Sequence, residues 1–322
     1  MGLLAAACPA GQSTTRLLFT RVHGAMGTDF TLYVYATDAA EADREADEVF
    51  AIVDRLDDLL SNYKPESELS RINAQAASCA VTTDPETVRF LEDSLGWSAR
   101  SNGAFDITVG RLMRAWGFFR GTGHLPSDAA LARVRAATGW RHVVLDAKTR
   151  TVRFTSPGVE LDPGGIGKGF AVDAAVKALR ANGVQAALLS AGSSTIYGLG
   201  TPPGQAGWKV RVPDLRHPGE TLATVVLQDT SLSTANCSQK HFDANGHEYC
   251  SIMDPRTLRP VGGRLQATVI AASATDSDAL SNVMFVLDAT GRRRVMRQLP
   301  AGDAALVMLS NGEVDRYRWP GT

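Results

Sequence analysis

The segment DPGGIGKGFAVD, Asp162 to Asp173, marks the point where strand-rich sequence gives way to a helix. Before it, HVVLD and TVRFTS flank a short turn at 147–150 and predict a β-hairpin. After it, the periodicity predicts a helix from about Ala171 to Asn182, which Gly183 ends, and then the apolar strand AALLSA. This order of hairpin, glycine-rich turn, helix and strand indicates a fold that mixes both element types.

The glycine-rich turn does not match the common nucleotide-binding patterns. A P-loop, GxxxxGK[ST], would need glycine at Asp162 and a hydroxyl at Gly169, and no GxGxxG fingerprint follows a strand here. Glycines beside a helix N-terminus and Lys168 still suit a phosphate group. The alternative is a tight turn with a solvated lysine.

Further elements extend outward from this segment. Thr28–Ala36 alternates like a strand, Ala42–Leu60 has helical periodicity, Ser61–Asn73 is predicted as a polar loop, and Glu86–Arg100 is predicted as a second amphipathic helix. Later segments predict strands, and the last two are joined by Asn311-Gly312, a strong hairpin signal: WKVRV, ATVVLQ, QATVIAA, ALVMLS and EVDRYRW. Strands joined by tight turns, with helices between them, predict an α+β fold with mixed or antiparallel sheets.

Composition narrows the class of protein. The chain of 322 residues has 33 basic and 34 acidic residues, so it has no broad positive field for nucleic acid. No apolar run reaches the roughly 20 residues of a membrane helix. No CxxC pair occurs, and Cys79, Cys237 and Cys250 are predicted to be ordinary thiols.

The N-terminus admits two interpretations. Residues 1–20 are either the remnant of an apolar leader with a lipidation site at Cys8, or a disordered terminus, and 21–322 form a single domain. A leader would place the protein in the cell envelope, on the periplasmic side, where an N-terminal lipid would be its only membrane attachment. Without one it would be cytoplasmic.

Two other clusters could carry chemistry. Asp278, Ser281 and Asn282 share one face of a helix predicted to begin near Ser277, and their oxygens suit Mg²⁺. An acid in the first turn of a helix also explains Asp278 without any metal. The segment 102–110, NGAFDITVG, places Asp106 beside an aromatic ring, which suits either a ring system or an ordinary turn.

Taken together, the motifs resemble those of the FAD:protein FMN transferase (ApbE) family. The matches begin with Met26-Gly27-Thr28 and the Ser-x-Tyr-x-x-x-Ser-Glu pattern of Ser61–Glu68, and they continue with Gly103–Gly110, Trp116-Gly117-Phe118, Asp162–Asp173, Ile252–Thr257 and Asp278–Leu280. The resemblance implies a T-fold-like flavin transferase fold. It also implies a Mg²⁺-dependent reaction that cleaves FAD and attaches FMN to a threonine or serine of a redox protein or pump subunit, with release of AMP.

The resemblance also implies roles for particular residues. FAD would contact Met26, Tyr63, Ala104, Phe105, Asp106, Asp162, Lys168 and Ile252, whereas Mg²⁺ would be held by the Gly165 carbonyl, Asp278, Ser281 and Asn282. Lys168 and Ser251 would be the catalytic positions.

The chain departs from the family pattern at several positions. Ser251 stands where the family has a histidine, and a serine is not a base near neutral pH, so His241 or His247 could serve instead. Asn282 replaces a metal-binding threonine, Ser233-Thr234-Ala235 replaces Thr-Ser-Gly, and Ser190–Ser194 departs from Asn-Ala-Gly-Gly-Asp. Two alternatives therefore stay open: an FAD pyrophosphatase, and a non-catalytic flavin-binding protein.

Overall fold

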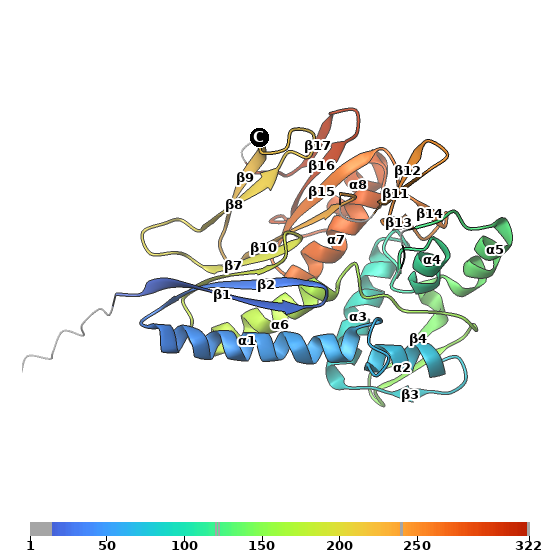
Figure 1. Ribbon diagram of the computed structural model, residues 1–322, viewed down its shortest axis with the longest axis horizontal. Coiled ribbons are helices and arrows are strands. Elements are labelled where there is room, and N and C mark those ends of the chain that lie inside the picture. The colour runs from blue at the N-terminus through green and yellow to red at the C-terminus, as the bar shows by residue number, and fades with distance from the viewer. Residues whose placement is uncertain (1–14, 120, 122, 239–240, 321–322) are drawn as a thin grey trace, which may run out of the picture.

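An eight-stranded antiparallel sheet forms the centre of the molecule (Figure 1). The computed structural model describes residues 15–119, 121, 123–238 and 241–320. The strands lie in the order β1 (Leu17–Ala25), β2 (Thr28–Ala36), β6 (Ala186–Ala191), β7 (Thr195–Gly200), β10 (Thr230–Asn236), β15 (Arg264–Ala271), β16 (Ala304–Leu309) and β17 (Val314–Tyr317). Each neighbouring pair is antiparallel, which confirms the predicted α+β class.

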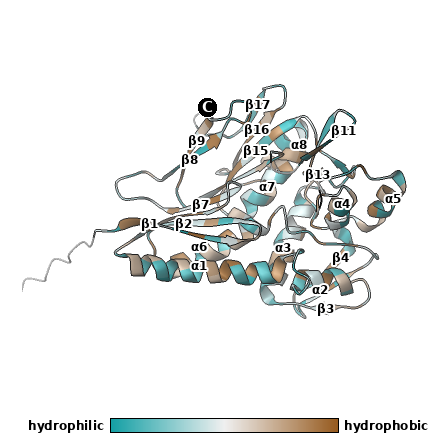
Figure 2. Cartoon of the chain, in the orientation of Figure 1, coloured by the Kyte–Doolittle hydropathy of each residue, from teal (hydrophilic) through white to brown (hydrophobic). Residues whose placement is uncertain are grey.

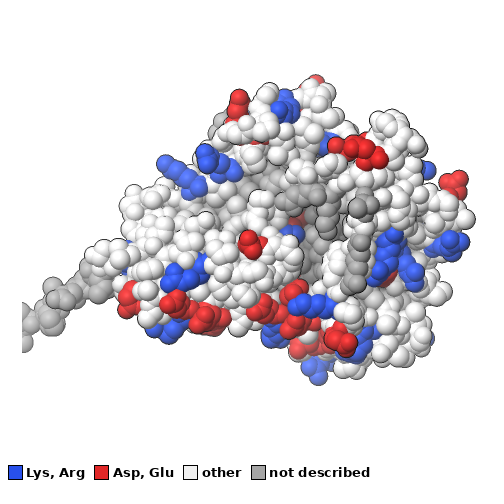
Figure 3. Space-filling model, viewed as in Figure 1, with Lys and Arg blue, Asp and Glu red and all other residues white. Residues whose placement is uncertain are grey.

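Three helices cover one face of this sheet: α1 (Ala39–Leu60), α6 (Gly167–Ala181) and α7 (Ala274–Val286). In α1, the buried residues recur at helical spacing, among them Val49, Val53 and Leu56. Figure 2 shows hydrophilic and hydrophobic residues alternating along α1, and Figure 3 shows acidic residues gathered over it at the lower edge. The apolar stripe therefore faces the sheet and the carboxylates face solvent.

The opposite face of the sheet carries a second, smaller core. The hairpin of β8 (Trp208–Pro213) and β9 (Thr221–Leu227) packs its apolar side onto residues of the central strands, including Leu232, Ile270 and Leu306. The sheet is thus buried on both faces, which explains why QATVIAA and ALVMLS are apolar almost without interruption.

The remaining elements gather at one end of the sheet, on the right in Figure 1. They are α2 (Glu68–Gln75), β3 (Val81–Thr82), α3 (Pro85–Arg100), α4 (Gly110–Ala115), α5 (Asp128–Ala137), the 3₁₀ turn Trp140–His142, β4 (Val143–Asp146), β5 (Thr151–Phe154), β11 (His241–Ala244), β12 (His247–Cys250), β13 (Met253–Asp254), β14 (Arg259–Pro260) and α8 (Ala289–Met296). The predicted hairpins β4–β5 and β16–β17 are both confirmed.

Three predicted boundaries differ from the structure. Part of the predicted polar loop 61–73 is helix α2, which Ser67 caps and which buries Leu69 and Ile72. Helix α6 begins at Gly167 instead of near Ala171, because its glycine-rich first turn is held by packing against α7. Helix α7 begins at Ala274, three residues before Ser277, with Ser273 as its N-cap.

The prediction of ordinary thiols is wrong for two cysteines. Cys237 and Cys250 form a disulfide with a Cα–Cα distance of 5.3 Å. They are 13 residues apart, but β11 and β12 return the chain antiparallel and bring Cys250 back beside the start of the hairpin. A disulfide needs spatial proximity and not a CxxC motif. Cys79 is an exposed free thiol.

The N-terminal predictions are only partly covered by the structure. Strand β1 begins at Leu17, so the end of the segment 1–20 belongs to the sheet. Cys8 and the expected leader lie outside the described residues. None of the helices in the described ranges is both long and apolar enough to cross a bilayer.

Candidate active site

A cavity of about 830 Å³ lies where α6, α7 and the elements at the end of the sheet meet. Its lining includes every site residue predicted from the sequence: Met26, Tyr63, Ala104, Phe105, Asp106, Asp162, Gly165, Lys168, Ser251, Ile252, Asp278, Ser281 and Asn282. These residues are up to 256 positions apart in the chain, yet the fold brings them to one place.

The glycine-rich turn forms one wall of the cavity at the N-terminus of α6. The Asp162 carboxylate accepts a hydrogen bond from the Gly164 amide at 2.8 Å, and the Pro163 carbonyl accepts from Ile166 and Gly167. No side chain caps the helix at Ile166. Of the first-turn amides of α6, that of Gly167 donates to the Pro163 carbonyl and that of Gly169 donates to Asp278, which leaves the Lys168 amide for a ligand. Lys168 lies in this first turn and also lines the cavity. Together they form a place where an anion is stabilised.

Gly169 allows α6 and α7 to cross closely. A Cβ atom at Gly169 would lie 2.2 Å from the Ala274 carbonyl oxygen and 2.8 Å from the Asp278 Cβ. The close approach lets the Asp278 Oδ2 accept a hydrogen bond from the Gly169 amide at 3.0 Å. Gly169, which is incompatible with the P-loop pattern, is thus the residue that lets α7 pack closely against α6.

A second carboxylate joins the same two helices in the opposite direction. Asp173 of α6 accepts hydrogen bonds from the amides of Ala274 and Thr275, each at 2.8 Å, and from the hydroxyls of Ser273 and Thr275. Each helix therefore supplies a carboxylate to the first turn of the other. We call this pair of contacts the reciprocal clamp.

Asp278 is the carboxylate best placed for a cation. Its side chain is buried, burial raises its pKa, and the positive charge of Lys168 opposes that rise. A carboxylate in such a place favours a bound cation, since burial otherwise penalises its charge.

Uncharged groups whose oxygens could bind a metal lie close to Asp278. The Asn282 amide nitrogen donates to the carbonyl oxygens of Gly165 (3.2 Å) and Asp278 (3.1 Å), and the Ser281 hydroxyl donates to the Asp278 carbonyl. Gly165 and Asn282 are close enough that a Cβ at Gly165 would lie 3.4 Å from the Asn282 amide nitrogen. One carboxylate with carbonyl, hydroxyl and amide groups fits a small hard cation, provided that the Asn282 amide turns its oxygen inward.

Asp106 lines the cavity, but its carboxylate is occupied by the protein. One oxygen accepts from the amide and hydroxyl of Thr108, and the other accepts from the Trp140 amide at 2.9 Å. Burial raises the pKa of Asp106, and these hydrogen bonds oppose that rise. Asp106 thus shapes the loop that presents Ala104 and Phe105.

An aromatic stack forms another wall, and the sequence reasoning missed most of it. The rings of Tyr63 and Phe119 are parallel with centroids 4.5 Å apart, and the Arg114 guanidinium lies 3.6 Å from the Phe119 centroid. Phe119 also lines the cavity. Its signal was the aromatic pair after Trp116-Gly117, but contact with Tyr63 could be found only in three dimensions.

Ser251 and Ile252 reach the cavity from the segment that follows the disulfide. Thr234, Ala235 and Asn236 of β10 line the same region. Neither His241 nor His247 lines the cavity, and both are exposed on the β11–β12 hairpin. In this structure neither histidine faces the cavity, and the suggestion that one of them replaces the missing base stays a prediction.

Comparison with known proteins agrees with this geometry. The family model described as "ApbE family" matches residues 26–307. The chain belongs to the ApbE family. A relative from Treponema pallidum, named FAD:protein FMN transferase, is 30% identical over 93% of this chain and 89% of its own length. A second with that name, from Klebsiella pneumoniae, is 30% identical over 88% and 86%.

Solved structures of ApbE proteins share the fold. The ApbE protein of Thermotoga maritima superimposes with a TM-score of 0.85 and 28% identity, covering 93% of this chain and 97% of that one. The flavinyl transferase ApbE of Pseudomonas stutzeri, in its apo form, gives a TM-score of 0.84 and 26% identity, with coverage of 95% and 96%. The expected flavin transferase fold is thereby confirmed for this ApbE-family chain.

Proposed function

We propose that this protein is an FAD:protein FMN transferase that cleaves FAD in a Mg²⁺-dependent reaction, joins FMN to a threonine or serine hydroxyl of a target protein, and releases AMP. One observation carries the proposal. A single cavity combines the N-terminus of α6 and Lys168 with the buried carboxylate of Asp278. The relatives named as FAD:protein FMN transferases support it.

The phosphate end of the cavity would bind the FAD pyrophosphate. The Lys168 backbone amide, at the positive end of α6, and the Lys168 ammonium would hold the phosphate oxygens in place. Gly165, Asp278, Ser281 and Asn282 would hold Mg²⁺ on the α7 side. Mg²⁺, when bound, neutralises charge that develops on the phosphates.

The flavin end is shaped by apolar and aromatic groups. Met26, Phe105, Ile252 and the Tyr63–Phe119 stack would enclose the ring system of FAD and exclude water from it. Ser251 lies next to Ile252 and would accept or donate a hydrogen bond to the incoming hydroxyl. Its role is positioning, because its hydroxyl has too high a pKa to act as a base.

We further propose that the acceptor is a redox protein or pump subunit and that both proteins work in the cell envelope. The Cys237–Cys250 disulfide supports this location, since disulfides persist in oxidising compartments and are rare in the cytosol. A lipid at Cys8 is part of the same proposal.

Incubation with FAD, Mg²⁺ and candidate acceptor domains tests the activity. Flavin fluorescence that stays on the acceptor band in a denaturing gel is the expected result. Free FMN and AMP without a labelled acceptor would instead identify an FAD pyrophosphatase. Bound but unchanged FAD would identify a flavin-binding protein.

The metal assignment predicts the effect of Asp278→Asn. We expect FMN transfer at low Mg²⁺ to fall by at least about 100-fold, because one charged ligand is lost with little change in shape. The measurement is initial rate against Mg²⁺ concentration, with circular dichroism to check folding.

Asp276→Asn is the matched control for this prediction. Asp276 lies on the same helix, is not among the residues that line the cavity, and accepts a hydrogen bond from the Trp97 indole that asparagine can still accept. It should leave the Mg²⁺ dependence unchanged. Full activity of Asp278→Asn at low Mg²⁺ would remove Asp278 from the metal site.

A further inference from the structure

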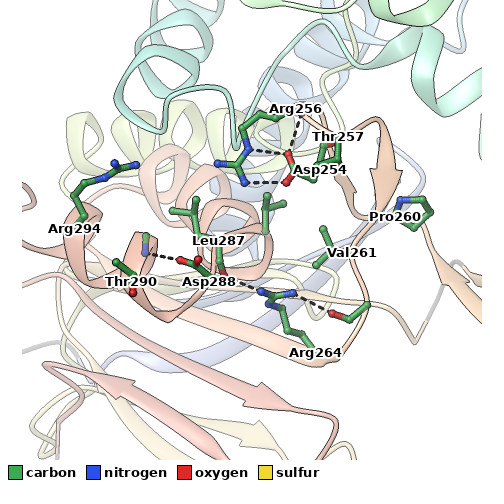
Figure 4. Close-up of a pocket in the computed structure, with 13 residues that line it drawn as sticks. Asp254, Arg256, Thr257, Pro260, Val261, Arg264, Leu287, Asp288, Thr290 and Arg294 are labelled. Atoms are coloured by element: carbon green, nitrogen blue, oxygen red, sulfur yellow. Dashed lines mark hydrogen bonds and ion pairs between the residues drawn. The ribbon is translucent and has the colours of Figure 1, made fainter. Parts of the chain in front are cut away.

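A second cavity, of about 540 Å³, lies beside the proposed active site and is lined by arginines (Figure 4). Its walls come from the β13–β14 turn, the start of β15, the end of α7 and the first turns of α8. Val286 lines both cavities, and Met253 and Pro255 line the active site on either side of Asp254. We call this second cavity the arginine pocket.

Its charges do not cancel. Three arginines and two aspartates line it: Arg256, Arg264, Arg294, Asp254 and Asp288. Both carboxylates are already used by the protein. Asp254 accepts two 2.8 Å hydrogen bonds from the Arg256 guanidinium, and Asp288 caps α8 by accepting one from the Gly291 amide at 2.7 Å. The lining therefore keeps one positive charge in excess.

The arginines have unused hydrogen-bond donors. Among the described residues, the exposed Arg294 guanidinium makes no hydrogen bond or ion pair, and the buried Arg264 Nε has no partner. Figure 4 shows the guanidinium groups of Arg256 and Arg294 pointing toward each other across the pocket above Leu287. Because Arg256 is already paired with Asp254, Arg294 is the guanidinium that an anion in the pocket would pair with.

The position of the pocket identifies the source of the anion. An acceptor that presents a hydroxyl near Ser251 must continue its chain past the rim of the active site. Ser251 and Asp254 are three residues apart, which is at most about 11 Å of extended chain. A side chain a few residues from the modified threonine or serine therefore reaches the arginine pocket.

We propose that the arginine pocket binds a carboxylate side chain, aspartate or glutamate, of the acceptor protein, about three to five residues from the hydroxyl that receives FMN. The inference rests on the proposed function. It assigns Arg294 as a specificity residue for the acceptor, in contact with the acceptor's carboxylate and not with FAD.

Paired synthetic peptides test the proposal. Each fluorescein-labelled peptide carries one threonine in a neutral glycine, alanine and glutamine background, with a single aspartate at a position two to six residues to either side, and its twin carries asparagine there. Fluorescence polarisation gives the affinity for the full-length enzyme. For at least one position, we expect the aspartate peptide to bind about fivefold more tightly than its twin.

Variants of α8 assign that preference to the pocket. Arg294→Gln should abolish the preference and Arg294→Lys should keep part of it. Arg293→Gln is the matched control, because Arg293 is exposed on the same helix and is not among the pocket's lining residues, and it should leave the preference intact. Equal loss in Arg293→Gln, or no aspartate preference at any position, would overturn the proposal.

Two further measurements separate this inference from its alternatives. AMP and inorganic phosphate serve as competitors, and displacement of the aspartate peptide by micromolar phosphate would identify a phosphate site instead. FMN transfer to the best peptide should show a KM about fivefold higher in Arg294→Gln, with kcat and FAD binding unchanged. Transfer that proceeds equally in both enzymes overturns the inference alone, whereas wild-type enzyme that never transfers FMN to any acceptor overturns the proposed function.

Discussion

Asp303 is a buried carboxyl whose ionisation is altered by its surroundings. Burial, and then the negative charge of Asp276, raise the pKa of Asp303 to about 6. A carboxyl with a raised pKa in the folded state destabilises the protein when it is charged. The free energy of unfolding therefore declines as pH rises from about 4 to 6, and the loss is constant above that.

Because the charged form of Asp303 destabilises the folded protein, a neutral substitute should stabilise it. Asp303→Asn should raise the free energy of unfolding by about 1 to 2 kcal/mol at pH 8 and leave it unchanged near pH 4. Urea unfolding at both pH values measures the difference. Asp243→Asn, at an exposed site on β11, is the control for loss of one charge. An equal gain at both pH values would show that charge is not the cause.

At the scale of elements, the reciprocal clamp decides how α6 and α7 are held. Asp173→Asn removes a charge that accepts hydrogen bonds from two amides and two hydroxyls. We expect the free energy of unfolding to fall by about 2 to 3 kcal/mol, because asparagine can satisfy only some of these donors. Urea denaturation gives the value.

Asp288→Asn provides the comparison for this prediction. Asp288 is an N-cap that serves only its own helix, α8, and asparagine caps a helix about as well as aspartate does. The free energy of unfolding of Asp288→Asn should therefore fall by less than about 0.5 kcal/mol. Similar losses in the two variants would show that the clamp contributes no more than an ordinary cap.

At the scale of the whole molecule, the Cys237–Cys250 disulfide gives a test of where the protein works. If the protein works in the envelope, Cys237 and Cys250 should resist alkylation in protein isolated from cells and react only after reduction, whereas the exposed Cys79 should react at once. Mass spectrometry counts the modified thiols. Free Cys237 and Cys250 in freshly isolated protein would contradict an envelope location.

Much of the architecture could be predicted from local sequence, for reasons that are themselves local. The hairpin at Asn311-Gly312 and the helix at Ala42–Leu60 follow from turn chemistry and periodicity within a few residues. Helix α2 was missed because only two of its side chains are fully buried, so its apolar signal is short.

The site was harder to predict because its parts meet only through packing. Motif spacing identified residues that line the cavity, but it could not show that the Asp106 carboxylate is occupied by Thr108 and Trp140. Pairings across the chain, such as Tyr63 with Phe119 and Cys237 with Cys250, depend on how distant segments fold back. Sequence patterns within one segment do not predict such long-range pairings.

The reciprocal clamp also bears on cooperativity. The Gly169 amide is held by Asp278 of α7, and the Ala274 and Thr275 amides are held by Asp173 of α6, so the end of neither helix can fray without releasing the other. Local opening at this point would expose both helix termini together, so it should cost more free energy than the fraying of a single helix end. The phosphate end of the cavity is thus held in shape by contacts within the protein itself.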